Sequence, residues 1–121
     1  LSLEPPLVMW ALRNSSSRRQ LLGDTQHFAV SVLATSQVEL ARRHAAFPPQ
    51  HQPLALWPAC LDGVPVIEGA AAHFVCRRSG ELPQGDHLLL FGEVLRFAEH
   101  DREPLLFMSG GFYSGQGLQR L

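Results

Sequence analysis

Short runs of β-forming residues, separated by close turn signals, are the feature that most restricts how this chain can fold. Strand-like runs are expected in six places: 7–12, 27–33, 64–68, 70–78, 87–99 and 105–108. Turn signals between them lie at Asp62-Gly63, in the segment 79–86 and in the segment 100–103. With so little helix between strands, this spacing favours a small β-barrel or sandwich with mostly antiparallel strands.

Four further expectations follow from local composition. The apolar run 7–12 after Pro5-Pro6 predicts a strand buried on both faces. Gly92 inside the longest run predicts a bulge or a kink. The proline-rich segment 47–58 predicts an ordered loop or a partner-facing arm, and the glycine-rich segment 109–117 predicts a flexible tail.

Two short helices are expected, near 16–22 and 36–46. The serines 15–17 are preferred helix N-caps, and Gly23 is a natural stop for the first helix. Ser36 and Glu39 have the spacing of a capping box, which predicts that the second helix starts there. The prolines that follow Phe47 end it.

Composition excludes several classes of protein. The chain has 121 residues, 45% of them hydrophobic and 17% charged, which fits one globular domain over residues 1–121. Its net charge of −1 offers no basic face for nucleic acid. We find no apolar stretch of the ~18–20 residues that a membrane span needs, and no signal peptide at the start. Two cysteines make no disulfide framework, so we expect reduced thiols in the cytoplasm.

Familiar catalytic motifs are absent from the sequence. It has no G-x-G-x-x-G, no Walker A loop, no H-E-x-x-H and no G-x-S-x-G. The pairs Asp86-His87 and His100-Asp101 do not form a metal site alone, because neighbours on a strand point to opposite faces, and we expect no metal. The cluster 15–19 (SSSRR) fits an anion pocket at a helix start, or a plain N-cap beside a solvated arginine pair.

Several segments together carry a family resemblance. In chain order they are 2–8 (SLEPPLV), 28–34 (FAVSVLA), Gln37 with 40–43 (LARR), 62–69 (DGVPVIEG), Cys76, 85–94 (GDHLLLFGEV), 104–107 (PLLF) and 111–113 (GFY). They resemble the flavin reductase-like domain, the FMN-binding split-barrel family, from residue 1 to about 113. His44 and Ala41 depart from the family's usual aromatic and Ser, and the upstream segment with G-x-T-x-S-S is not in this sequence.

The resemblance implies a fold and an activity. The fold would be an antiparallel split β-barrel of Greek-key type with two short helices, lacking the family's N-terminal part. The activity would be NAD(P)H-dependent reduction of FMN or FAD, in a homodimer that can supply reduced flavin to a monooxygenase. FMN or FAD would be the cofactor, and NADH or NADPH the co-substrate. Two alternatives stay open: a flavin-binding electron-transfer or sensor protein without NAD(P)H turnover, and a truncated non-catalytic dimerisation module.

The resemblance also implies a flavin site. Trp10, Ala11 and Leu12 would run beside the flavin and contact it through the backbone, although core packing also explains Trp10. Ser16 and Ser17 would hold a phosphate at a helix start.

Four further residues would complete this site. His87 would lie near the nicotinamide side as the residue assigned to catalysis, although it could also be a turn histidine bonded to Asp86. Phe112 and Tyr113 would border the same pocket, or pack as tail residues on the barrel. Arg42 would contact a phosphate, or lie on a solvated helix face.

Overall fold

The computed structural model describes residues 1–16, 25–45, 59–115 and 120–121. These residues form two compact units. The first unit comprises residues 1–29 and 74–97, and the second comprises residues 30–73 and 98–121. The elements, in chain order, are β1 (Ser2–Leu3), β2 (Pro6–Arg13), β3 (His27–Val32), η1 (Thr35–Gln37), α2 (Val38–Ala45), β4 (Ala59–Leu61), β5 (Val64–Val66), β6 (Ala72–Gln84), β7 (His87–Glu99), β8 (Leu105–Met108) and β9 (Gly111–Ser114).

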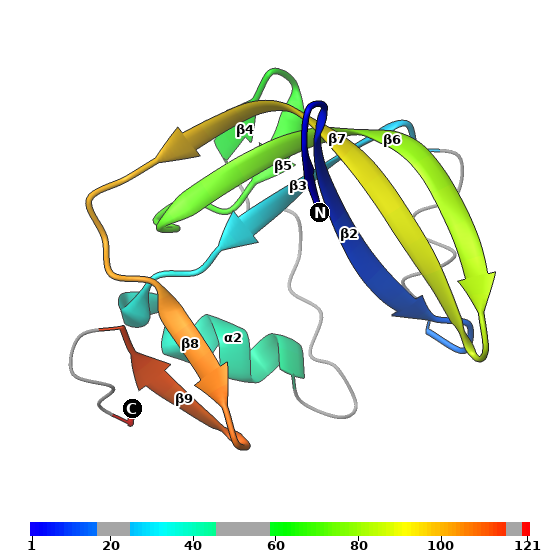
Figure 1. Ribbon diagram of the computed structural model, residues 1–121. Helices are drawn as coiled ribbons and strands as arrows, with labels where there is room; N and C mark the ends of the chain where they lie inside the picture. The colour runs from blue at the N-terminus through cyan, green and yellow to red at the C-terminus, as the bar shows by residue number, and fades with distance from the viewer. Residues whose placement is uncertain (17–24, 46–58, 116–119) are drawn as a thin grey trace. The chain divides into compact units, whose positions relative to one another are not determined.

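The main sheet has the strand order β1-β2-β7-β6-β3. β2 pairs antiparallel with β7, in a register that runs from Leu7 opposite Glu93 to Arg13 opposite His87. Figure 1 shows β2, β7 and β6 side by side as long curved strands. The predicted fold, mostly antiparallel β-structure, is confirmed.

Only one face of β2 is buried, so the prediction of burial on both faces is wrong. Leu12 is 5% exposed and packs with Leu88 and Leu90, whereas Met9 is 46% exposed. Successive side chains of a strand point to opposite faces, and β2 therefore has a core face and an outer face. An apolar run alone does not distinguish these two environments.

β6 continues through the segment where a turn was expected. It runs to Gln84, and the turn is confined to Gly85 and Asp86. Gly85 has a φ of 58°, which a glycine adopts without steric cost. The prediction of a turn over 79–86 is wrong because pairing in the sheet overrides the local preference of Ser79, Gly80 and Pro83.

Gly92 causes no bulge in the β2–β7 ladder. The pairs run without offset through Val8 opposite Gly92. A Cβ atom at Gly92 would lie 2.5 Å from Cζ of Phe28 and 3.0 Å from Cβ of Cys76. The glycine is therefore needed because an aromatic ring and a buried cysteine pack directly on the strand, and the β2–β7 ladder does not have the predicted bulge.

The second unit contains two hairpins (Figure 1). β4 and β5 are joined at Asp62 and Gly63, which have φ values of 53° and 79°. The turn at this Asp-Gly pair is confirmed, whereas β4 was not predicted. β8 pairs with β9, so the segment expected to be a flexible tail contains a strand.

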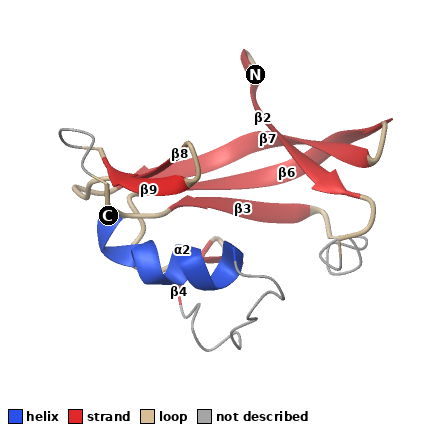
Figure 2. Ribbon diagram, turned by 90° about the horizontal axis from the view of Figure 1, so that it is seen from below, coloured by secondary structure: helices blue, strands red, loops and turns tan. Residues whose placement is uncertain are grey.

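The described helix begins earlier than the capping box predicted. η1 leads directly into α2, and the N-cap is Ala34. The N–H of Ala34 donates to Oε1 of Gln37 at 2.9 Å, and the N–H of Gln37 donates to the carbonyl of Ala34 at 2.8 Å. The prediction of a capping box formed by Ser36 and Glu39 is therefore wrong. Figure 2 shows this helix in blue. The helix expected near 16–22 and the proline-rich segment 47–58 lie almost wholly outside the described residues.

A buried histidine in the second unit makes stability depend on pH. His73 is 6% exposed, its Nδ1 lies 3.2 Å from Oγ of Ser31, and its ring centroid lies 5.1 Å from that of His100. Burial, then the charges of His100 and Arg102, hold the pKa of His73 below its usual 6.5. The unfolded chain therefore takes up a proton at a higher pH than the folded protein does.

We accordingly expect the melting temperature to fall as the pH is lowered from about 6.5 through the folded-state pKa of His73. His73→Gln removes the titrating group and should flatten this part of the stability profile. His27→Gln, a change at an exposed histidine, is the control and should leave the profile unchanged. Melting curves between neutral and mildly acidic pH measure this, and an equal slope in wild type and His73→Gln would contradict it.

Candidate functional site

One end of the β2–β7 ladder brings together residues that are far apart in the sequence. Arg13 lies opposite His87 in the register. The N–H of Asn14 donates to the carbonyl of Asp86 at 2.9 Å, and the N–H of Ser16 donates to the carbonyl of Arg13 at 3.0 Å. Two of the predicted site residues, Ser16 and His87, therefore lie at the same end of the ladder in the first unit.

His87 is bonded to its neighbour in the turn. Its Nδ1 lies 2.7 Å from Oδ1 of Asp86, and the side chains are 36% and 86% exposed. This hydrogen bond, then the charge of His87, a backbone hydrogen bond and the charge of Arg13 lower the pKa of Asp86 from its usual 3.8. Asp86 is thus an ionised hydrogen-bond acceptor at neutral pH, and Nε2 of His87 is the ring nitrogen that remains for a ligand.

Trp10, Ala11 and Leu12 alternate between the two faces of β2. Leu12 is buried, Trp10 packs against the cluster of Leu12, Leu88 and Leu90, and Ala11 is exposed. Core packing thus explains the side chains of Trp10 and Leu12. A ligand beside all three residues would have to bind their backbone.

The backbone of β2 has an edge that suits such a ligand. β1 pairs with β2 only at Pro6 and Leu7. Beyond Leu7, no strand of the described residues pairs with this edge, because β7 occupies the opposite one. Unpaired N–H and C=O groups along a strand are hydrogen-bonding partners for a flat polar ring.

The indole of Trp10 offers a second unpaired group. Its Nε1 is buried and has no hydrogen-bond partner among the described residues. The ring centroid lies 6.0 Å from that of Phe28, with the two planes tilted by 60°. A buried donor without an acceptor costs free energy, so a ligand oxygen that reached this N–H would be favoured.

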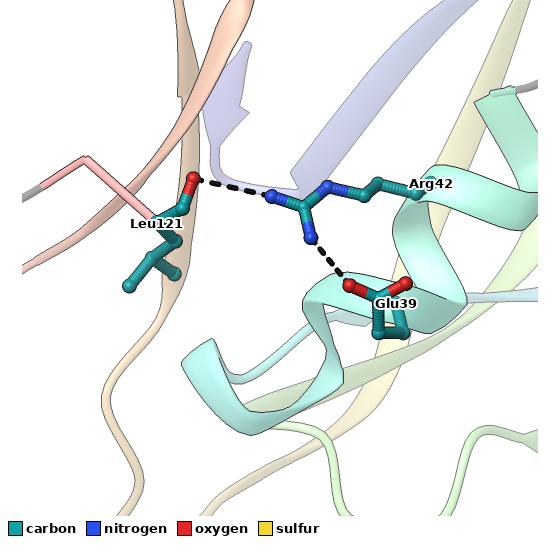
Figure 3. A network of polar contacts seen from close by, with 3 residues as sticks. All are labelled: Glu39, Arg42 and Leu121. Carbon is teal, nitrogen blue, oxygen red and sulfur yellow. Dashed lines mark hydrogen bonds and ion pairs between the residues drawn. The ribbon is translucent and has the colours of Figure 1, made fainter.

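Three predicted site residues, Arg42, Phe112 and Tyr113, lie in the second unit. The guanidinium of Arg42 pairs with Glu39 on the same helix and donates to the carbonyl of Leu121 at 3.1 Å (Figure 3). The N–H of Leu121 donates to the carbonyl of Phe112 at 2.8 Å. Arg42 is thus linked to β9, which carries Phe112 and Tyr113.

One predicted site residue is not described by the structure, and one residue near His87 was not predicted. Ser17 lies outside the described residues, so nothing tests its role. Arg13 was not expected near His87, because its place depends on the register of two strands, which the sequence does not reveal. Nowhere in the described ranges do three or more His, Cys, Asp or Glu side chains gather as a metal site would require. Within the same ranges, no helix is long and apolar enough to span a membrane.

Comparison with curated proteins finds relatives over nearly the whole chain. The chain is 42% identical over 112 residues to "FMN reductase (NADH) SmoA" of Agrobacterium fabrum. The aligned region covers 93% of this chain and 64% of the relative. The chain is 32% identical over 120 residues to an "NADH-dependent flavin reductase" of a Rhodococcus species. This alignment covers 99% of this chain and 67% of the relative. The chain therefore spans about two thirds of the length of these proteins.

Solved structures give the same result. The flavin reductase PheA2 superimposes with a TM-score of 0.83 at 30% identity, over 94% of this chain and 73% of that one. BorF, the flavin reductase component of a bacterial two-component tryptophan halogenase, gives a TM-score of 0.84 at 31% identity, over 94% and 75%. Residues 1–116 also match the protein family described as "Flavin reductase like domain". This match, together with the relatives and the shared fold, shows that the chain belongs to the flavin reductase-like domain family.

Proposed function

We propose that this protein is an enzyme that oxidises NADH and reduces FMN or FAD. The observation that carries the proposal concerns the described residues, among which no strand pairs with the edge of β2 beyond Leu7 and the buried indole N–H of Trp10 has no acceptor. Both features lie beside the ladder end that holds Ser16 and His87. The names of the relatives support NADH as the reductant, since two of them are an FMN reductase (NADH) and an NADH-dependent flavin reductase.

The chemistry of such a reaction requires little of the protein. A bound flavin supplies the hydride acceptor, and the nicotinamide supplies the hydride. The protein has to bind both rings, orient them and accommodate the negative charge of the reduced flavin. No nucleophile or catalytic triad is needed.

The described residues suit a flavin in two ways. The unpaired edge of β2 can exchange hydrogen bonds with the polar edge of an isoalloxazine ring, and Ala11 leaves room because its side chain is small. Among the described residues the Nε1–H of Trp10 has no acceptor, and an isoalloxazine carries carbonyl oxygens that can accept its hydrogen bond. We therefore assign Trp10, Ala11 and Leu12 to the isoalloxazine.

The phosphate end of the flavin is assigned to the serines. Ser16 is half-buried at the ladder end, directly after the turn that its N–H closes on Arg13. Ser17 follows it in the sequence, and hydroxyls favour phosphate oxygens. Arg42, Phe112 and Tyr113 remain proposed contacts of the flavin or of the nicotinamide.

The serine assignment gives a measurable expectation. Changing Ser16 and Ser17 together to Ala should weaken FMN binding by ~1–3 kcal/mol, because hydrogen bonds to a charged group are lost. A fluorescence titration with FMN measures this. Ser79→Ala, at an exposed serine of β6, is the control and should bind FMN as wild type does. Unchanged affinity in the double variant would assign these serines to capping alone.

We also propose that the protein is a homodimer. The first unit exposes apolar side chains on the outer face of β2 and β7: Met9 is 46%, Leu95 48% and Phe97 64% exposed. Met9 lies opposite Phe91, and alternation along β7 puts Leu95 and Phe97 on the same side as Phe91. An apolar surface of this kind is typical of a protein interface.

A charge placed on this surface should weaken the dimer. We expect wild type to be dimeric at micromolar concentration by light scattering, and Phe97→Glu to shift it towards monomer. Phe107→Glu is the matched control, because Phe107 is 68% exposed but lies on β8 in the second unit. A wild-type monomer, or equal dissociation of both variants, would contradict the assignment.

The wider setting is proposed on the same basis. Several relatives are named as reductase components of monooxygenases, which supports delivery of reduced flavin to a monooxygenase partner. The cytoplasm, where NADH is available, is the proposed location. We treat residues 1–121 as one domain, because β3, β6 and β7 each contribute residues to both units.

A further inference from the structure

The guanidinium of Arg42 connects α2 to the last two residues of the sequence. One of its nitrogens pairs with Glu39, three residues earlier on the same helix, and another donates to the carbonyl of Leu121 at 3.1 Å (Figure 3). Both side chains of the ion pair are exposed, so the pair contributes little to stability. Its effect is on geometry, because a guanidinium is planar and the bond to Glu39 orients the nitrogen that reaches Leu121.

Residues 120–121 lie along β9 as a short antiparallel addition to that strand. The N–H of Leu121 donates to the carbonyl of Phe112 at 2.8 Å, and Arg120 forms an antiparallel bridge with Tyr113. Ordering even a short segment costs conformational entropy, and two residues form few backbone hydrogen bonds to offset this cost. The charge-assisted bond from Arg42 to the carbonyl of Leu121 therefore adds to the contacts that hold the segment on β9.

The side chain of Arg120 lies over the strand that this segment joins. Its Cζ is 6.0 Å from the centroid of the Tyr113 ring, within the range of a cation–π contact. Gly111 lies on the same face of β9 as Tyr113, and a Cβ there would be 2.8 Å from Nε and 3.0 Å from Nη2 of Arg120. The guanidinium thus occupies the space that a side chain at position 111 would need, and it defines part of the surroundings of the Tyr113 ring.

We propose that Arg42 is a positioning residue for Tyr113. It anchors residues 120–121 beside β9, and this anchor keeps the guanidinium of Arg120 over the Tyr113 ring. The inference rests on the proposed function, because Tyr113 is a proposed contact of the flavin or of the nicotinamide. Arg42 itself need not touch either ligand, and its effect on the reaction should pass through residues 120–121.

Tyr113 is the only tyrosine of the sequence, so its ring signals in an NMR spectrum of tyrosine-labelled protein report on this anchor. Arg120→Ala removes the guanidinium and gives the reference signals of an uncovered ring. Arg42→Ala should move the Tyr113 signals towards this reference, because the segment that carries Arg120 is released. Arg43→Ala, at the neighbouring exposed arginine of α2, is the matched control and should leave the signals unchanged.

A double-mutant cycle measures whether Arg42 acts through Leu121. Leu121→Pro removes the N–H that donates to Phe112, and so loosens the same segment without a change on α2. Each single variant should raise the KM for NADH roughly two- to fivefold, the effect of one hydrogen bond, with a smaller change in kcat. The double variant should have the KM of the more affected single variant, because both bonds hold one segment. Arg42→Lys keeps the charge but not the planar fork, and should recover only part of the wild-type KM.

The outcomes separate this role from a direct contact of Arg42 with a phosphate. A direct contact would raise KM by the same factor with and without Leu121→Pro, and this result would overturn the proposal. Unchanged Tyr113 signals in Arg42→Ala would also overturn it. If the signals moved as predicted but wild type did not oxidise NADH, the anchor on Tyr113 would be supported and the proposed function would be refuted.

Discussion

Replacing Gly92 with Ala should destabilise the protein by about 2–3 kcal/mol, the upper part of the usual range for overpacking in a core. The added Cβ would lie 2.5 Å from Cζ and 2.9 Å from Cε1 of Phe28, and 3.0 Å from Cβ of Cys76. Phe28 cannot simply turn away, because its ring packs against Trp10. Urea unfolding, followed by tryptophan fluorescence, measures the loss.

Two further variants separate this clash from a general effect of glycine substitution. Gly80→Ala should be nearly neutral, because its Cβ would meet only Cδ2 of Phe91, at 3.9 Å. Adding Phe28→Leu to Gly92→Ala should recover part of the lost stability, since the smaller side chain leaves space for the new methyl group. Wild-type stability of Gly92→Ala would refute the packing described here.

Replacing His87 with Ala should lower kcat/KM for NADH about tenfold or more, equivalent to at least ~1.4 kcal/mol of transition-state stabilisation. His87 opens β7 opposite Arg13, and its Nε2 is the ring nitrogen that Asp86 does not occupy. FMN affinity should stay close to that of wild type, because Ser16 and the edge of β2 are unchanged.

Steady-state kinetics beside an FMN titration and a melting curve decide this result. His27→Ala is the matched control, because His27 opens β3 as His87 opens β7 and is exposed. It should have normal kinetics. If His87→Ala lowered the melting temperature but kept wild-type kinetics, His87 would only stabilise the turn.

The strands that the sequence predicted best are those in which two signals agree. β7 was predicted with its observed bounds, 87–99, because a Gly-Asp turn precedes a long run of β-formers. β6 was predicted too short because Gly80 and Pro83 resemble turn residues, yet pairing in the sheet keeps this segment extended. β9 was missed for a similar reason: its glycines indicated a tail, although its partner β8 lies only a turn away.

The sequence named candidate site residues but not their geometry. The family resemblance named Ser16 and His87, and both lie at one end of the β2–β7 ladder. The place of Arg13 opposite His87 depends on strand register, which composition does not encode. Trp10 packs against the cluster of Leu12, Leu88 and Leu90, and its buried N–H has no acceptor among the described residues. Such features arise from tertiary contacts, so no local pattern could have shown them.

The most direct test of the central claim is to mix this chain with FMN and NADH in the absence of oxygen, and to follow both absorbances. We predict that NADH is consumed as the yellow flavin colour disappears, and that the rate depends on the protein and on both small molecules. Repeating the assay with FAD and with NADPH would define the preferred pair. A folded protein that binds FMN but does not bleach it with NADH would contradict the account, and would favour a flavin-binding electron-transfer or sensor protein.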